Sequence, residues 1–332
     1  MTFSTMRPTC GLLGLILVLV PVALTVSDAV SAETWPSRNI QAIVPLAPGN
    51  AQDVVSRIVF DQLSRQILRP VIVENRAGAG GTIGVAAVAR AEPDGHTILV
   101  HSSSFSASYS LHKSLPYDTF KDFTAVVPLG IQPIVLVAAP SRGWKTAGDV
   151  IAAAKANPGK LNYASAGVGA ASHLAAERFR LSAGISAQHI PFRGPVEAMT
   201  EVLTGRIDFY LLPVVAAISH INSGNVVALA VSTDKRAAAL PNVPTMAEAG
   251  LKDANYAFWN GIFVPAKTPR AIVTRLYRET EKALAVPSVR EQLAKVGQEP
   301  LSMTTEQFEK YFRDDVRNTA LLMQKAGLQA FY

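Results

Sequence analysis

Short apolar, β-branched segments alternate with amphipathic helical segments along most of the chain, and this alternation constrains the fold more than any other feature. In the first series, strands are predicted at residues 40–46, 71–74 and 97–101, with helices at 53–67 and 82–90 between them. Strands that alternate with helices in this way form a parallel sheet, and such sheets bind ligands at the carboxyl ends of their strands.

A second series of the same kind follows. Strands are predicted at 134–138, 161–164, 188–191, 207–211 and 225–232, helices at 147–155, 171–181 and 196–203, then a strand at 257–264 and helices at 270–285 and 305–326. Two series favour two α/β lobes, with the chain crossing between them near 124–133 and 250–260. We predict that residues 33–125 and 256–332 form lobe 1 and that residues 126–255 form lobe 2, so that a ligand touching both lobes could close the cleft.

The first 32 residues have the pattern of a removable secretory leader. Arg7 supplies a positive charge, residues 11–26 are uncharged and mostly apolar, and small residues precede a cleavage point at Ala32. An apolar run of this length, interrupted by Pro21, falls short of the roughly 20 residues that cross a bilayer. We therefore expect export to the periplasm with cleavage near Ala32; a membrane anchor is the alternative.

Composition and motifs narrow the function class. The single cysteine, Cys10, lies in the leader, so the exported chain has no disulfide, thiol nucleophile or cysteine metal ligand. The net charge of +6 is dispersed, without the Lys/Arg run that marks a nucleic-acid surface. No hydrolase elbow, zinc-protease helix or P-loop is present, and the six histidines lack metal-ligand spacing. We expect no enzymatic activity, no metal and no cofactor.

Two strand-to-helix loops, one in each predicted lobe, form the candidate binding site. Each ends at a helix N-terminus, whose free N–H groups and positive dipole suit a carboxylate. Loop 1 contributes Pro48, Gly49, Asn50, Ala51, Gln52 and Asp53, and loop 2 contributes Ser165, Ala166, Gly167, Gly169, Ser172 and His173.

Each of these positions has an ordinary structural alternative. Loop 1 could be a plain turn in which Asp53 caps the helix. A structural or ligand-facing His173 is favoured over a catalytic one, because Ser172 beside it points elsewhere on a helix. Ser103 lies where a cleft floor would be, and Arg193 could pair with a carboxylate or remain a solvated surface cation. Trp259 could line the ligand site or pack at the hinge.

Several ordered motifs resemble one family. They include Ile43-Val44-Pro45 with Pro48-Gly49 and Asp53, Val73 to Gly81 (VENRAGAGG), Pro93 to Thr97 (PDGHT), Pro158 to Ser165 (PGKLNYAS), His189 to Gly194 (HIPFRG), and Leu240 to Thr245 (LPNVPT). On these motifs, from Trp35 to Gly327, the chain resembles the Bug/TctC solute receptors of tripartite tricarboxylate transporters.

The resemblance implies a periplasmic, two-lobed Venus-flytrap protein of the type II binding-protein fold that holds a carboxylate between loops 1 and 2. It implies one large and one small integral membrane subunit as partners, with transport driven by an ion gradient; we expect the receptor itself to be a monomer.

Two departures from the family pattern bear on the ligand. Asn50-Ala51-Gln52 replaces the glycine and threonine that are usual in loop 1, and Leu211-Leu212-Pro213 stands where many members have a polar residue facing the cleft. These changes favour a monocarboxylic or aromatic acid over citrate. A periplasmic serine hydrolase using Ser165 or Ser172 with His173 remains an alternative, as does a ligand sensor for a signalling partner.

Overall fold

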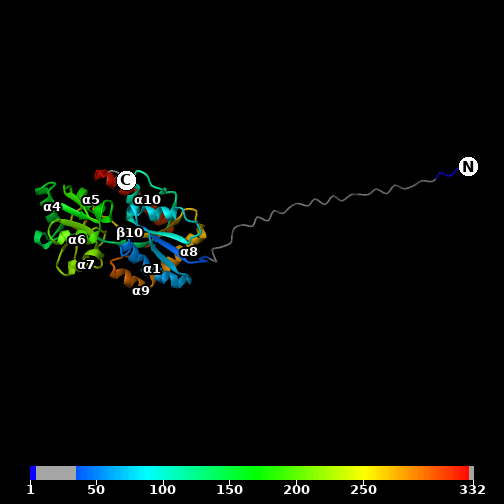
Figure 1. Ribbon diagram of the computed structural model, residues 1–332, viewed down its shortest axis with the longest axis horizontal. Helices are drawn as coiled ribbons and strands as arrows, with labels where there is room; N and C mark the ends of the chain where they lie inside the picture. The colour runs from blue at the N-terminus through cyan, green and yellow to red at the C-terminus, as the bar shows by residue number, and fades with distance from the viewer. Residues whose placement is uncertain (5–34, 329–332) are drawn as a thin grey trace.

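The chain forms two separate five-stranded sheets in the computed structural model, which describes residues 1–4 and 35–328. One strand, Phe123–Gln132, was not predicted, because the sequence indicated a crossing segment there. Figure 1 shows the sheets as two lobes, the first sheet in the right-hand lobe and the second in the left-hand one. The first sheet has the order β2 (Val71–Asn75), β1 (Ile40–Val44), β3 (Thr97–Ser102), β10 (Phe258–Pro265), β4 (Phe123–Gln132), and the second β7 (Gln188–Pro191), β6 (Asn162–Ser165), β8 (Phe209–Pro213), β5 (Ile134–Ala138), β9 (Val227–Val231).

Helices cover both sheets, and sequence reasoning found most of them. The helices around the first sheet are α1 (Ala51–Ile67), α2 (Thr82–Ala89), α3 (Ser103–Leu111), α8 (Arg270–Ala285), α9 (Pro287–Lys295) and α10 (Thr305–Lys325). Those around the second are α4 (Ala147–Ala156), α5 (Ala171–Ala183), α6 (Pro195–Leu203) and α7 (Val214–Asn222). The short helices α3, α7 and α9 were not predicted, because each fills a segment that the sequence pattern left between two stronger elements.

The parallel pairing expected for the first series, residues 40–101, is confirmed, but each complete sheet is mixed. In the first sheet β1 pairs in parallel with β2 and β3, but β10 runs antiparallel to both β3 and β4. In the second sheet β6 pairs in parallel with β7 and β8, whereas β5 runs antiparallel to β8 and β9. The antiparallel strands β10 and β5 are those that enter a sheet directly from the other lobe, whereas the parallel strands follow the helical crossovers that the prediction assumed.

Each sheet has a buried apolar layer on both faces. Val55, Val59 and Leu63 of α1 pack on one face of the first sheet, and Phe308 and Phe312 of α10 on the other. The second sheet is sandwiched in the same way between two further clusters. A lobe with two buried faces can fold around its own core, which explains how two lobes arise from one chain.

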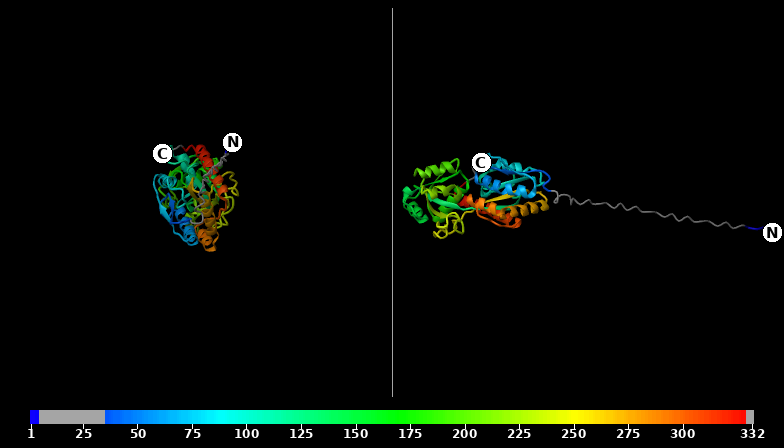
Figure 2. Two further views of the ribbon diagram at one scale, coloured as in Figure 1. Left: turned by 90° about the vertical axis from the view of Figure 1, so that its right-hand side faces the viewer. Right: turned by 90° about the horizontal axis from the view of Figure 1, so that it is seen from below.

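The chain passes between the sheets at two places. Pro133 alone separates β4 from β5, and residues 232–257 lead from β9 back to β10. The lobe limits predicted from the sequence stay predictions. The last helix adds a further connection, because Phe308 and Phe312 belong to the core of the first lobe, whereas Leu322 and Met323 belong to the cluster that contains Phe179 of the second. Figure 2 shows the same division into two lobes from below.

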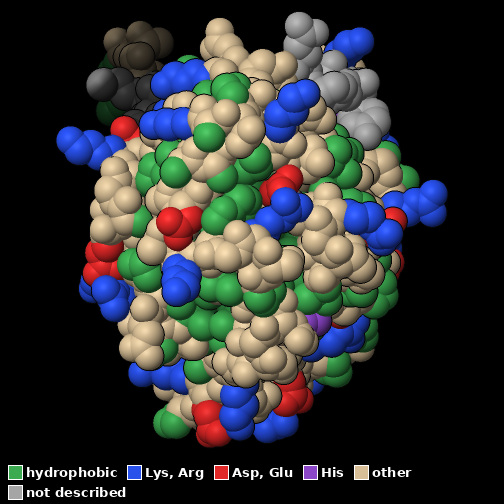
Figure 3. All heavy atoms as spheres, turned by 90° about the vertical axis from the view of Figure 1, so that its left-hand side faces the viewer, with side chains coloured by type: hydrophobic (Ala, Val, Ile, Leu, Met, Phe, Trp, Pro, Cys, Tyr) green, Lys and Arg blue, Asp and Glu red, His purple; other side chains and the backbone are tan. Residues whose placement is uncertain are grey.

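The predicted leader, residues 1–32, lies almost entirely outside the described residues. Across the part of the chain that the structure describes, no helix has the length and apolar character needed to cross a bilayer. Figure 3, which faces the outer end of the second lobe, shows basic and acidic side chains interspersed on that surface. That distribution agrees with the dispersed charge of the sequence.

Candidate functional site

Loop 1 is held in place by its own side chains. Asn50, not Asp53, is the N-cap of α1: its Oδ1 accepts hydrogen bonds from the N–H groups of Gln52 (2.9 Å) and Asp53 (3.2 Å). Asp53 Oδ2 accepts in turn from the N–H of Gly49 (2.8 Å). The helix therefore begins two residues earlier than predicted, because the extended backbone of Asn50 lets a short amide reach the first turn.

Asp53 is engaged within its own lobe. Burial alone would raise its pKa, but hydrogen bonds from Arg57, from the Gly49 N–H and from Asn75, with the charge of Arg57, outweigh burial and lower the pKa of Asp53. The carboxylate forms an ion pair with Arg57 at 2.9 Å and is almost fully buried. Of the loop 1 residues proposed for binding, Asp53 thus supports the loop, whereas Pro48 and Gly49 are exposed at its tip.

Loop 2 is also held in place by hydrogen bonds from its backbone N–H groups to its own side chains. Ser172 Oγ accepts from the Ala166 N–H (3.0 Å), Ser165 Oγ accepts from the Gly167 N–H (3.2 Å), and His173 Nδ1 accepts from the Gly169 N–H (3.1 Å). Three of the backbone donors that sequence reasoning assigned to a ligand are therefore bonded to the loop's own side chains.

The hydrogen bond from Gly169 determines the tautomer of His173. Because Nδ1 is the acceptor, the proton lies on Nε2, and that atom is buried without a partner among the described residues. The ring stacks on His189 with 3.8 Å between centroids. Burial, then the neighbouring His189 and Arg180, lowers the pKa of His173 to about 3. His173 is thus a neutral structural acceptor.

Ser165 and His189 form a close pair that does not make a nucleophile. Ser165 Oγ lies 2.6 Å from His189 Nε2, but Ser165 is fully buried and also donates to the Gly167 carbonyl. A serine nucleophile needs a histidine oriented by a carboxylate. The nearby carboxylate, Glu177, is already bonded to Tyr163 and Arg180. The serine hydrolase alternative thus has no catalytic geometry here.

Two of the free backbone donors in these loops are at matching positions of two helices. The N–H groups of Ala51, Val168 and Ala171 have no hydrogen bond within the described residues. Ala51 and Ala171 are the first residues of α1 and α5, where helical N–H groups have no partner inside the helix. One such donor comes from each lobe.

The two loops converge on one buried cluster. Ala51 of loop 1 packs against the cluster that contains Ala171 of loop 2 and Leu111 at the end of α3. Gly169 of loop 2 lies so close to Leu111 that an added Cβ would be 2.1 Å from Leu111 Cδ1. The two lobes are therefore in direct contact beside the loops, and Leu111, which the sequence did not indicate, is part of this contact.

Ser103 and Arg193 differ in position. Ser103 begins α3, is buried, and accepts a hydrogen bond from the Tyr256 hydroxyl at 3.2 Å. Arg193 is exposed, and its backbone N–H donates to Glu197.

Leu211 and Leu212 are fully buried on opposite faces of the second sheet, so that only Pro213 of that segment is partly exposed at the strand end.

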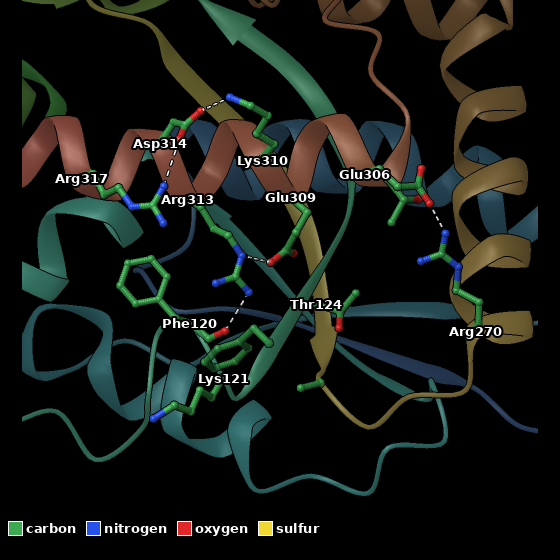
Figure 4. Close-up of a pocket in the computed structure, with 13 residues that line it drawn as sticks. Phe120, Lys121, Thr124, Arg270, Glu306, Glu309, Lys310, Arg313, Asp314 and Arg317 are labelled. Carbon is green, nitrogen blue, oxygen red and sulfur yellow. Dashed lines mark hydrogen bonds and ion pairs between the residues drawn. The ribbon is translucent and has the colours of Figure 1, made fainter.

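A hollow away from loops 1 and 2 is lined by charges that are paired with one another. It has a volume of about 590 Å³ and lies between α10, the start of α8 and the segment before β4. Figure 4 shows Arg313 bonded to Glu309 and to the Phe120 carbonyl, and Arg270 bonded to Glu306. The remaining cations that line it, Lys121, Lys310 and Arg317, are also paired with carboxylates. The hollow offers no unpaired cation to a carboxylate.

Two buried histidines give folding a pH dependence. Burial lowers the pKa of His101 to about 3, and His173 has the same value. Both are neutral in the folded protein, whereas in the unfolded chain they gain protons below a pKa of about 6.5. The free energy of unfolding is therefore expected to fall as the pH drops from 6.5 towards 4, by up to about 1.4 kcal/mol per pH unit for each histidine.

Urea denaturation at intervals between pH 7.5 and 4.5 measures this slope. The His173→Asn variant, whose amide oxygen can replace Nδ1 as the acceptor from Gly169, should lose about half of the slope that the two histidines produce. An unchanged slope in that variant would show that His173 is not the titrating group.

Two α/β lobes joined by crossing segments, with a helix N-terminus from each meeting at a shared contact, define a solute-binding protein of the type II Venus-flytrap class. The family model "Tripartite tricarboxylate transporter family receptor" (TctC) matches residues 55–328. The chain belongs to this family, whose members are binding receptors and not enzymes.

Individual relatives agree with the family match. A Pseudomonas sp. (strain P51) protein named "UPF0065 protein in tcbD-tcbE intergenic region" is 36% identical over 314 residues, 94% of each chain. The solved structure of the periplasmic binding protein BugD is 32% identical, with a TM-score of 0.77 over 90% of this chain and all of that one. MatC from Rhodopseudomonas palustris, solved with bound malate, is 28% identical, with a TM-score of 0.76 over 87% of this chain and 99% of that one.

Proposed function

We propose that this protein is an extracytoplasmic receptor that captures a small carboxylate between loops 1 and 2 and delivers it to a tripartite tricarboxylate-type secondary transporter. The main support is the pair of free N–H groups at Ala51 and Ala171, one from each lobe. Ala171 belongs to one apolar cluster, and Ala51 packs against the same cluster. A carboxylate has two oxygens and can accept from both helix N-termini at once, which favours the closed arrangement of the lobes.

The binding residues follow from this arrangement. Ala51 and Ala171 donate to the carboxylate with Val168, and Pro48, Gly49, Ala166, Gly167 and Gly169 shape the two loops around it. Asn50, Asp53, Ser165, Ser172 and His173 hold the donors in place through the bonds described above, and Gln52 lies directly beside Ala51. Ser103 and Arg193 complete the proposed surroundings of the ligand.

The ligand class is a monocarboxylic or aromatic acid. The cations that line the 590 Å³ hollow are all paired with carboxylates, and Arg193 is exposed. Among these described cations, none is available to bind a second carboxylate in a buried site. Loop 1 is occupied by larger side chains than glycine at Asn50 and Gln52. The malate of MatC makes a dicarboxylate the natural comparison.

Export and assembly complete the proposal. A leader at residues 1–32 with cleavage near Ala32 places the receptor in the periplasm. There it meets the large and small integral membrane subunits as a monomer.

A thermal-shift screen followed by calorimetric titration tests the proposal. A carboxylate at 100 times its Kd stabilises the folded protein by about 2.7 kcal/mol, which raises Tm on the order of 5 °C. Benzoate, butyrate, malate, adipate and citrate form the panel, with benzamide as the uncharged control. Tight binding of citrate or a dicarboxylate with none for the monocarboxylates would refute the proposed ligand class. Binding of benzamide and benzoate with equal affinity would refute carboxylate recognition.

A further inference from the structure

A cavity of the first lobe is separate from loops 1 and 2. It has a volume of about 330 Å³ and lies between α8, α9, β4 and residues 298–302. Figure 1 labels α8 and α9 in the right-hand lobe. The residues that line the cavity all lie outside loops 1 and 2. Its volume is at the lower end of the range of about 300–1,000 Å³ that is usual for small-molecule sites.

The wall of this cavity is mostly apolar. Four leucines line it: Leu129 of β4, Leu284 of α8, Leu293 of α9, and Leu301. Leu129 and Leu293 are buried, whereas Leu284 and Leu301 are only partly buried. A molecule bound here would therefore place an apolar body against these side chains.

Several polar side chains of the wall already have partners. Arg290 Nε donates to the Leu284 carbonyl at 3.3 Å, and Glu299 Oε1 accepts from the Ala238 N–H at 3.1 Å. The side chain of Gln298 donates to a backbone carbonyl of β4 at 3.2 Å. These groups support the wall and are not free to bind a ligand through the same atoms.

Glu281 is the exception. Within the described part of the chain its carboxylate has one hydrogen-bonding contact, the Ser302 hydroxyl at 3.5 Å, and it forms no ion pair. Burial raises the pKa of Glu281, and the hydrogen bond from Ser302 offsets this only in part. A partly buried charge without a partner is costly, and a cation that enters the cavity would reduce this cost.

The charges and shape of the wall determine which kind of cation fits. The charged lining residues are Glu281, Glu299 and Arg290, so that two negative charges and one positive charge give a net charge of −1. The lining residues include no aromatic ring, which removes the usual means of binding a quaternary ammonium group. A primary ammonium group can instead donate hydrogen bonds to oxygen atoms.

We propose that this cavity binds a small organic cation, a primary ammonium group on an apolar body, through Glu281. The ammonium donates to the Glu281 carboxylate and to the Ser302 hydroxyl oxygen, and the apolar body contacts the four leucines. A charge-assisted hydrogen bond of this kind is about twice as strong as a neutral one. The site is additional to the proposed carboxylate site, and neither depends on the other.

Calorimetric titration of charged and neutral isosteres tests the pairing. The probes are cyclohexylamine and isoamylamine, which are charged at pH 7.5, and the matched alcohols are cyclohexanol and isoamyl alcohol. At least one ammonium should bind about tenfold or more tightly than its alcohol, because only the ammonium pairs with the carboxylate. If neither ammonium binds measurably, or if each alcohol binds as tightly as its ammonium, the inference fails.

A single substitution assigns the effect to Glu281. Glu281→Gln keeps the length of the side chain and removes its charge, so it should abolish the advantage of the ammonium over the alcohol. Glu279→Gln is the matched control: Glu279 lies two positions earlier in α8, outside the cavity lining, and pairs with Lys282 at 2.8 Å. This variant should keep the advantage. An advantage that persists in Glu281→Gln would overturn the assignment.

The melting temperature and the structure of the complex provide independent checks. Because Glu281→Gln removes a partly buried charge without a partner, it should leave Tm unchanged or raise it. A large fall in Tm would show that Glu281 has a structural partner and would contradict the inference. In a crystal of the complex, the cyclohexylammonium nitrogen should lie within about 3.2 Å of a Glu281 carboxylate oxygen, and a position elsewhere on the protein would refute the site.

Discussion

Replacing Gly169 with alanine is expected to weaken carboxylate binding by about 10- to 100-fold. The new methyl group would be 2.1 Å from Leu111 Cδ1, across the contact between the lobes. Overpacking of this kind costs about 1–3 kcal/mol, and this cost falls on the closed arrangement of the lobes. Since the open arrangement avoids the clash, the cost should appear in the Kd measured by calorimetry more than in the free energy of unfolding.

A matched control isolates the clash from backbone strain. Gly184 has a φ of +60° against +76° for Gly169, but an added Cβ there meets no atom within 4 Å. Gly184→Ala should therefore cost stability through left-handed strain without changing the Kd. Adding Leu111→Ala to Gly169→Ala should restore part of the lost affinity by removing the atom that clashes. If Gly169→Ala binds as tightly as the unaltered protein, the contact does not form in the bound state.

Replacing Arg180 with methionine should destabilise the fold by about 3 kcal/mol or more. Its guanidinium forms three hydrogen bonds to Glu177, whose side chain is only 5% exposed. Removing one partner of a buried ion pair leaves the other charge uncompensated, which typically costs about 3–5 kcal/mol. Urea denaturation at pH 7.5 measures the loss, and Glu177→Gln in the same chain should recover much of it.

Arg206→Met is the control for an exposed pair. Arg206 pairs with Glu201 in the same lobe, but its side chain is 67% exposed. Exposed ion pairs contribute about 0–1 kcal/mol, so this substitution should be nearly neutral. Equal losses of unfolding free energy in Arg180→Met and Arg206→Met would show that burial of the unpaired Glu177 carboxylate carries no extra cost.

The alternation of strands and helices was sufficient to predict two α/β lobes, because the apolar period depends only on the local burial of each segment. The direction of β10 was not predictable in this way. Its apolar pattern is the same for either direction, and only the return of the chain from the second lobe makes it antiparallel.

Loops 1 and 2 lie at helix N-termini, as the sequence predicted, but the roles of their side chains were not readable from the sequence. Asn50 and Asp53 are both good N-cap residues, and the choice between them depends on the backbone conformation of Asn50. Trp259 shows the same limit: it is fully buried among Phe263, Phe308 and Phe312. Nothing in the strand pattern distinguishes a core tryptophan from one that faces a cleft.

The contact that His101 makes with Gln52 could not be predicted from the sequence. His101 directly precedes three serines at the end of a predicted strand, where a parallel sheet places ligands. Its pairing with Gln52 joins residues 49 positions apart, and no local pattern indicates it.

The last helix limits how this protein can open. Phe308 and Phe312 lie in the core of the first lobe, whereas Leu322 and Met323 lie in a cluster that joins α3 to the core of the second lobe, so α10 spans both lobes (Figure 1). A swing that pulls its end from the second core would expose large apolar side chains, at about 1.5–3 kcal/mol for each one fully exposed. A hinge axis close to the C-terminal end of α10 avoids this exposure. The helix therefore favours opening of the lobes about that axis and disfavours a wide opening at its C-terminal end.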